Sequence, residues 1–169
     1  EDKIVVIHRQ WKSGDIVELT MDMNFKYTRW YENSLGIERG PLVYALRIEE
    51  DWRKIEKKGM TDRVFWEVYP KSAWNYAILG KELKEESFNL RVSENIPDNP
   101  WNLKNAPIQI RVKAVRLPEW RIENHSAGKM FVPSRIKKDA KRGGNKVEDI
   151  TLIPYGCTTL RISQFPMIE

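Results

Sequence analysis

The sequence predicts an all-β fold, an antiparallel β-sandwich of jelly-roll type with long loops and at most one or two short helical turns. Apolar and polar residues alternate over several short segments, most clearly at residues 108–114, and this period is typical of half-buried strands. Turn-forming residues separate about ten such segments at intervals of about ten to fifteen residues, a spacing typical of sandwiches. Residues 42–48 begin apolar on both faces, which indicates a strand near the middle of a sheet.

The first third of the chain predicts a hairpin followed by this central strand. Residues 3–9 and 17–23 read as strands, and the turn between them contains Gly14, which can take a positive φ, and Asp15, which can bond nearby amides. Aromatic extended chain over residues 25–31 and a turn at residues 32–36 follow.

Gly40 and Pro41 then break regular structure before the central strand. In that strand, the residues at alternate positions are expected to share the buried face: Leu42, Tyr44, Leu46 and Ile48.

The remaining elements are predicted from the alternation of apolar and polar residues and from turn-forming residues. Residues 49–61 are charged and predict a loop with some helical turn, and residues 96–107 contain three prolines that exclude them from a sheet interior. We expect that second loop to be ordered and anchored by Trp101. Further strands are expected at residues 64–70, 75–80, 88–92, 108–114, 150–155 and 159–165, with a long loop at residues 124–146.

Composition excludes several classes of protein. The chain of 169 residues has a net charge of +5, but acids accompany bases nearly everywhere, and the basic cluster at residues 135–146 lacks aromatic residues, which argues against nucleic-acid binding. No apolar run approaches the roughly 20 residues that a membrane span needs. The single Cys157 excludes an internal disulfide.

The domain organisation expected is one β-sandwich unit over residues 1–169, taken from a larger protein because the chain opens inside a strand-like segment without a signal peptide. An alternative division assigns residues 1–35 to a preceding sandwich and residues 36–169 to the main one. The location of the parent stays open: periplasmic, extracellular or cytoplasmic in a bacterium.

No complete catalytic or metal-binding constellation is visible in the sequence. Cys157 has no base at a recognisable spacing, and His8 and His125 lie far apart, so the sequence predicts no catalytic residue and no metal site. Carboxylates are numerous, but sequence spacing nominates no glycosidase-type pair. Trp101 and Trp120 are the candidate carbohydrate-binding residues, since an indole ring in a loop can stack on the C–H face of a sugar; the alternative is that such rings pin loops to the core.

Four segments, in this order, resemble the C-terminal part of the family-127 glycoside hydrolases, bacterial β-L-arabinofuranosidases and their relatives: residues 9–19 (RQWKSGDIVEL), 38–46 (ERGPLVYAL), 72–77 (SAWNYA) and 152–162 (LIPYGCTTLRI). The resemblance implies a parent with an N-terminal (α/α)6 barrel that carries the chemistry, followed by β-sandwich domains. In that family a cysteine nucleophile is held with zinc by further cysteines and a glutamate in the barrel. None of those motifs occurs here, and Cys157 matches a strand motif instead.

The function that this resemblance implies is that of a non-catalytic accessory β-sandwich, inactive alone, in an enzyme that acts on plant-type, L-arabinofuranoside-like glycans. Its expected partners are the catalytic barrel of the same polypeptide, a glycan and a second copy of the chain, but neither nucleic acid nor a membrane. We expect no cofactor in this chain, any zinc belonging to the barrel. A carbohydrate-binding module using loop tryptophans is the alternative. The matching segments contain the residues expected to determine turns and packing: Trp11, Gly14, Asp15, Gly40, Pro41, Trp74, Asn75, Tyr76, Pro154, Tyr155 and Gly156.

Overall fold

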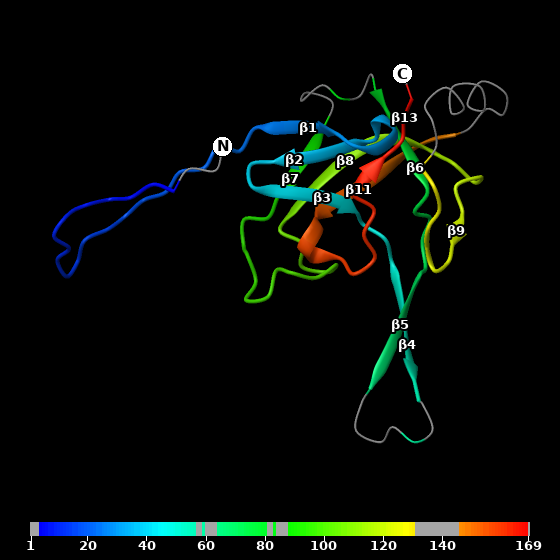
Figure 1. Ribbon diagram of the computed structural model, residues 1–169, viewed down its shortest axis with the longest axis horizontal. Coiled ribbons are helices and arrows are strands. Elements are labelled where there is room, and N and C mark those ends of the chain that lie inside the picture. The colour runs from blue at the N-terminus through cyan, green and yellow to red at the C-terminus, as the bar shows by residue number, and fades with distance from the viewer. Residues whose placement is uncertain are drawn as a thin grey trace.

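One curled β-sheet forms the body of the protein in the computed structural model, which describes residues 4–56, 59, 64–80, 83, 88–130 and 146–168 (Figure 1). Its nine strands run in the order β1-β2-β3-β11-β8-β6-β13, with β12 also paired to β2 and β7 to β8. The all-β prediction is confirmed. The strands of this sheet are β1 (Phe25–Arg29), β2 (Leu35–Arg39), β3 (Leu42–Leu46), β6 (Tyr76–Leu79), β7 (Asn89–Val92), β8 (Ile108–Arg116), β11 (Val147–Pro154), β12 (Gln164–Phe165) and β13 (Met167–Ile168).

Two small hairpins stand beside this sheet. The strands β4 (Glu50–Ile55) and β5 (Phe65–Pro70) form a hairpin that projects from the body (Figure 1), and β9 (Ile122–Glu123) pairs with β10 (Ser126–Ala127). The described residues contain two 3-10 turns, η1 (Tyr31–Asn33) and η4 (Tyr155–Cys157).

The C-terminal segment bridges two strands that lie far apart in the order of the main sheet. In β12, Phe165 pairs with Leu35 of β2 in antiparallel fashion, and in β13, Met167 pairs with Ile78 of β6 in parallel. The sheet therefore curls round a common core, with β1 and β13 as its terminal strands. The parallel pair differs from the antiparallel arrangement expected from the sequence.

The core lies inside this curl and matches the alternation in the sequence. Tyr44 and Leu46 of β3 are buried, whereas Val43 is exposed. Along β8 the buried Ile110, Val112 and Ala114 alternate with exposed residues. The buried apolar residues of this cluster are Leu35, Ile37, Tyr44, Leu46, Ile48, Tyr76, Ile78, Phe88, Ile110, Val112, Ala114, Ile150, Leu152 and Phe165.

The turns predicted at two of the sequence motifs are confirmed. Gly40 has a φ of 58° and lies with Pro41 between the paired residues Arg39 and Leu42, so that β2 and β3 form a tight hairpin. At the N-terminal turn, Gly14 has a φ of 91°. There Asp15 donates its backbone N–H to Lys12 at 3.1 Å.

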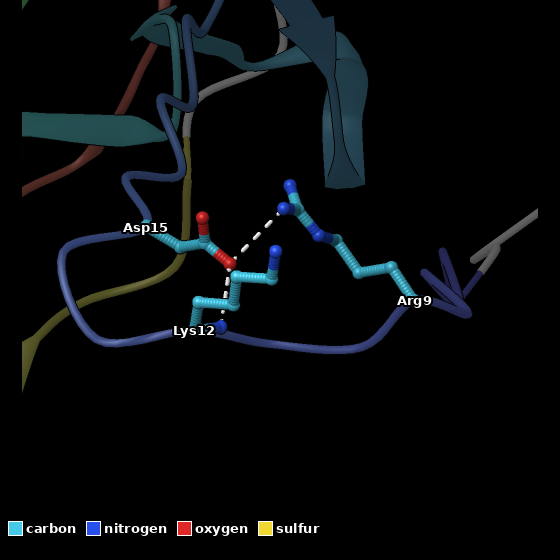
Figure 2. A network of polar contacts seen from close by, with 3 residues as sticks. All are labelled: Arg9, Lys12 and Asp15. Atoms are coloured by element: carbon cyan, nitrogen blue, oxygen red, sulfur yellow. Dashed lines mark hydrogen bonds and ion pairs between the residues drawn. The ribbon is translucent and has the colours of Figure 1, made fainter.

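Figure 2 shows how the Asp15 carboxylate holds the N-terminal turn. Its Oδ2 accepts hydrogen bonds from the Lys12 backbone N–H at 2.8 Å and from the Arg9 guanidinium at 3.0 Å. This turn forms because all of its contacts lie within a few residues of one another.

The strands predicted on either side of that turn, at residues 3–9 and 17–23, are wrong for the part the structure describes. Residues 4–24, here called the N-terminal arm, form no β-ladder and extend away from the sheet (Figure 1). Val17, Leu19 and Met21 are exposed. Alternation predicts a buried face, but a strand also needs a neighbouring strand for its backbone. Residues 17–23 form no ladder with any described residue, and the body contacts the end of the arm through the Gly40 N–H, which donates to the Asn24 carbonyl at 3.2 Å.

Three other sequence assignments are corrected. The turn expected at residues 32–36 ends earlier, since Leu35 and Gly36 belong to β2. The strand expected at residues 159–165 is limited to β12, and β13 was missed. Most of the loop expected at residues 124–146, with the basic cluster, lies outside the described residues.

The loop expected at residues 49–61 is instead occupied by β4 over its first half. The charged residues predicted a loop, but side-chain contacts between the two strands of the hairpin stabilise a strand here. The rings of Trp52 and Trp66 meet edge to face at 6.2 Å, and the Arg53 guanidinium lies 4.4 Å from the centre of the Tyr69 ring.

Glu50 attaches this hairpin to the body. Its Oε1 accepts hydrogen bonds from the backbone N–H of Thr159 at 2.6 Å, from that of Leu160 at 3.1 Å and from the Thr158 hydroxyl at 3.2 Å. The carboxylate thereby satisfies two backbone donors in the segment that follows η4.

Asn75 fastens the turn that ends β8. Its side-chain amide donates to the carbonyl of Leu117 at 2.7 Å and to that of Trp120 at 2.9 Å, and Leu117 donates its N–H to the Asn75 carbonyl at 2.7 Å. On either side, Trp74 packs edge-on against Trp120 at 5.1 Å, and the Tyr76 hydroxyl donates to Glu148 at 3.0 Å.

We predict that Asn75→Ala lowers the free energy of unfolding by about 2 kcal/mol or more, because two buried carbonyls lose their donor. Chemical denaturation followed by circular dichroism measures the change. The exposed Asn95 provides the matched control, Asn95→Ala. An equal loss in the two variants would contradict the role assigned to Asn75.

Candidate functional site

One accessible aromatic surface of the body centres on Trp101, which is 56% exposed in the irregular loop between β7 and β8. The ring lies over Gly156 of η4: a Cβ at Gly156 would come 3.1 Å from Cε3 of the indole. Gly156 thus allows a close approach that a larger residue would disturb.

Asparagine side chains hold this loop in place. Asn99 accepts the backbone N–H of Trp101 at 3.1 Å, and its own carbonyl accepts the side-chain amides of Asn102 and Asn105, each at 3.0 Å. Asn102 in turn accepts the backbone N–H groups of Lys104 and Asn105. These local bonds replace a ladder in a segment that its prolines keep out of the sheet, and they fix the position of the Trp101 ring.

Two hollows flank the ring. The apolar hollow has a volume of about 300 Å³ and is lined by Pro41, Leu42, Val43, Pro154, Tyr155 and Gly156. The mixed hollow has a volume of about 380 Å³, and its polar and aromatic lining includes Glu50, Trp52, Asn102, Lys104, Thr159 and Arg161. We call Trp101 and these two hollows the Trp101 surface.

The other tryptophan nominated from the sequence lies in a different environment. Trp120 is 3% exposed, contacts Trp74 and donates its indole N–H to the Gly128 carbonyl at 2.8 Å. Its ring therefore pins a turn to the core and presents no face to a ligand. The structure adds Trp52 and Tyr155, both about half exposed, which sequence analysis had not nominated as binding residues.

Cys157 sits beneath the Trp101 loop and is 1% exposed. Its Sγ donates to the Pro100 carbonyl at 3.4 Å, which ties the loop to η4. Burial raises the pKa of the thiol above its ordinary value, opposed by a smaller effect of the Asn102 backbone. A neutral buried thiol is a packing group and a poor nucleophile at neutral pH.

The two histidines lie far apart in the structure. His8 lies in the arm and His125 in the turn between β9 and β10. Within the described ranges, no three His, Cys, Asp or Glu residues are placed to hold a metal ion. In the same residues, no helix has the length and apolar character that crossing a membrane requires.

A larger cavity, of about 610 Å³, opens at the base of the β4–β5 hairpin. Ile48, Trp74 and Leu160 supply apolar lining. At its rim the Tyr69 hydroxyl donates to the Glu67 carboxylate at 2.6 Å, and this bond raises the pKa of Tyr69. Arg161 also lines this cavity, and its Nε donates to the carbonyls of Tyr155 and Thr158.

Comparisons with known proteins add no relative: no protein-family model, no curated protein and no solved structure matches the chain.

We predict that native protein reacts slowly with an aromatic disulfide reagent at pH 8, and that one thiol per chain reacts at once in concentrated guanidinium. Because burial raises the pKa of the Cys157 thiol above its ordinary value in the folded state, the free energy of unfolding is unaffected by this group at lower pH and falls only as the pH rises above the ordinary thiol pKa. Release of the chromophore measures the reaction. Rapid labelling of native protein would contradict the burial of this thiol.

Proposed function

We propose that this chain is a non-catalytic accessory β-sandwich of a bacterial glycoside hydrolase that acts on plant-type, L-arabinofuranoside-like glycans, and that it supports an (α/α)6 catalytic barrel of the same polypeptide. The four sequence segments that resemble the family-127 enzymes suggest this role, and the all-β fold is compatible with it.

The observation that carries the proposal is the exposed apolar surface of the N-terminal arm. Ile4, Ile16 and Leu19 are 91%, 88% and 79% exposed. Monomeric soluble proteins rarely expose contiguous apolar segments of this kind, which usually mark an interface. A neighbouring domain that pairs with the arm would satisfy both its backbone and its apolar face.

The projecting hairpin adds a second surface of the same character. Trp52 and Trp66 are each about half exposed on it. A two-stranded hairpin is marginal by itself in water, so packing against a neighbouring domain would stabilise it.

We predict that the double substitution Val17→Asp and Leu19→Asp changes the stability of this chain by less than about 0.5 kcal/mol, because both side chains are solvated here. In the full polypeptide that contains the barrel, the same change lowers the melting temperature by several degrees. Differential scanning calorimetry on both proteins measures this.

The control for this experiment is Glu18→Lys with Thr20→Asp, on the alternate positions of the arm. Equal effects of the two double variants in the full polypeptide would contradict docking through the apolar face. Turnover of aryl arabinofuranosides by this chain alone would contradict the non-catalytic role.

The second candidate function is carbohydrate binding, and the exposure of Trp101 specifically favours it. The ring offers an apolar plane for the C–H face of a sugar, and the mixed hollow beside it offers amide, hydroxyl and ammonium groups for sugar hydroxyls.

We predict that Trp101→Ala weakens binding of arabinan oligosaccharides at least tenfold, since stacking on an aromatic ring contributes on the order of 1 kcal/mol or more. Isothermal titration calorimetry measures the affinity. Trp30→Ala removes another half-exposed indole and serves as the control. If both variants bind as the wild type does, the Trp101 surface is not a glycan site.

A further inference from the structure

The Trp101 surface continues into a third hollow through Lys104. Lys104 lines the mixed hollow and also a separate hollow of about 430 Å³ beside the ends of β7 and β8. The polar residues that line this third hollow are Arg91, Ser93, Asn95, Lys104, Asn105 and Gln109. The two hollows share Lys104 as a wall residue, so one elongated ligand that passes this side chain would contact both hollows and Trp101.

The third hollow is positively charged. Arg91 and Lys104 are its only ionisable lining residues in the described part of the chain, and neither forms an ion pair with a described carboxylate. Glu94 and Asp98 lie near in sequence but do not line it. Ion pairs between described residues lie elsewhere, as between Lys113 and Asp149 at 3.1 Å. Two unpaired cations in one concavity raise the local concentration of anions.

The mixed hollow has one carboxylate, Glu50, against the two cationic side chains of Lys104 and Arg161. The Oε1 atom of Glu50 accepts three hydrogen bonds from residues 158–160, and its Oε2 atom accepts the Trp52 indole N–H at 3.0 Å, so both carboxylate oxygens are engaged within the protein. The Arg161 guanidinium lies 4.6 Å from the centre of the Tyr155 ring.

The lining also favours a hydroxylated ligand over a simple anion. Asn95, Asn105 and Gln109 each carry an amide that can donate to and accept from hydroxyl groups. Trp101 supplies a stacking plane for a ring. A chain of sugar rings that bear carboxylates combines these features.

We infer that the Trp101 surface and the third hollow together bind an acidic polysaccharide, with one sugar ring stacked on Trp101 and a uronate carboxylate held by Lys104 and Arg91. This inference rests on the carbohydrate-binding candidate above and names its ligand class. Ammonium and guanidinium groups bind carboxylates through charge-assisted hydrogen bonds, which are stronger than those of neutral groups.

The test compares oligogalacturonate with neutral arabinan oligosaccharides of similar length, by titration calorimetry on the full 169-residue chain. The variant is Arg91→Gln with Lys104→Gln. The control is Lys26→Gln with Arg47→Gln, which removes the same charge from exposed sites outside these hollows. Thermal melts establish that both variants fold.

The expected result is that the wild type binds oligogalacturonate more tightly than arabinan. The Arg91 and Lys104 variant loses tenfold or more for the acidic ligand alone, and the control loses less than twofold. Raising the salt from about 0.05 M to about 0.5 M weakens the acidic ligand selectively, because screening lengths shorten.

Three results would overturn the inference. Equal losses in variant and control would assign the binding to net charge. Trp101-dependent binding of arabinan without any preference for the acidic ligand would refute the acidic class while leaving the carbohydrate-binding candidate standing. Absence of binding to either glycan would refute both, and the accessory role would then depend on the arm experiment alone.

Discussion

The fold depends on closure of the curled sheet by residues 164–168. Phe165 is fully buried and pairs with β2, whereas Met167 and Ile168 pair with β6. Pro166 stands between them, and its carbonyl accepts the N–H of Ile78 at 2.9 Å. Proline has no N–H to donate, so it suits the position where the chain leaves one neighbour and joins the other. Without this segment, Leu35 and Gly36 of β2 and Ile78 and Leu79 of β6 would lose their ladder partners on this side.

The alternation of apolar and polar residues predicted the strands that have a neighbouring strand on each side in the sheet. β3 and β8 have internal places in the sheet: residues 110–114 of β8 alternate between buried and exposed, and β3 ends with three consecutive buried residues, as expected of a strand that is apolar on both faces. The arm carries an equally clear pattern at residues 17–23, yet it forms no strand, because periodicity describes a face and says nothing about which backbone will pair with it. β12 and β13 have two residues each, too few for any period to be read.

The two loop tryptophans show why the candidate site was only half predictable. Trp101 and Trp120 both follow a proline-containing stretch, and nothing in their local sequences separates them. Their exposure differs because of residues distant in sequence: Asn75 holds the Trp120 turn against the core, and Gly156 supports Trp101 from below while leaving its other face open. The loop itself was foreseeable from its prolines, but the asparagine bonds that set the direction of the ring were not.

The β4–β5 hairpin pairs only with itself, from Glu50 opposite Pro70 to Ile55 opposite Phe65, and reaches the body through Glu50 and the Ser72 hydroxyl. No strand of the curled sheet pairs with β4 or β5. Insertions, deletions and substitutions in the outer part of this hairpin therefore leave the packing of the core unchanged. We expect related chains to differ in the length of this hairpin while their main sheets stay alike.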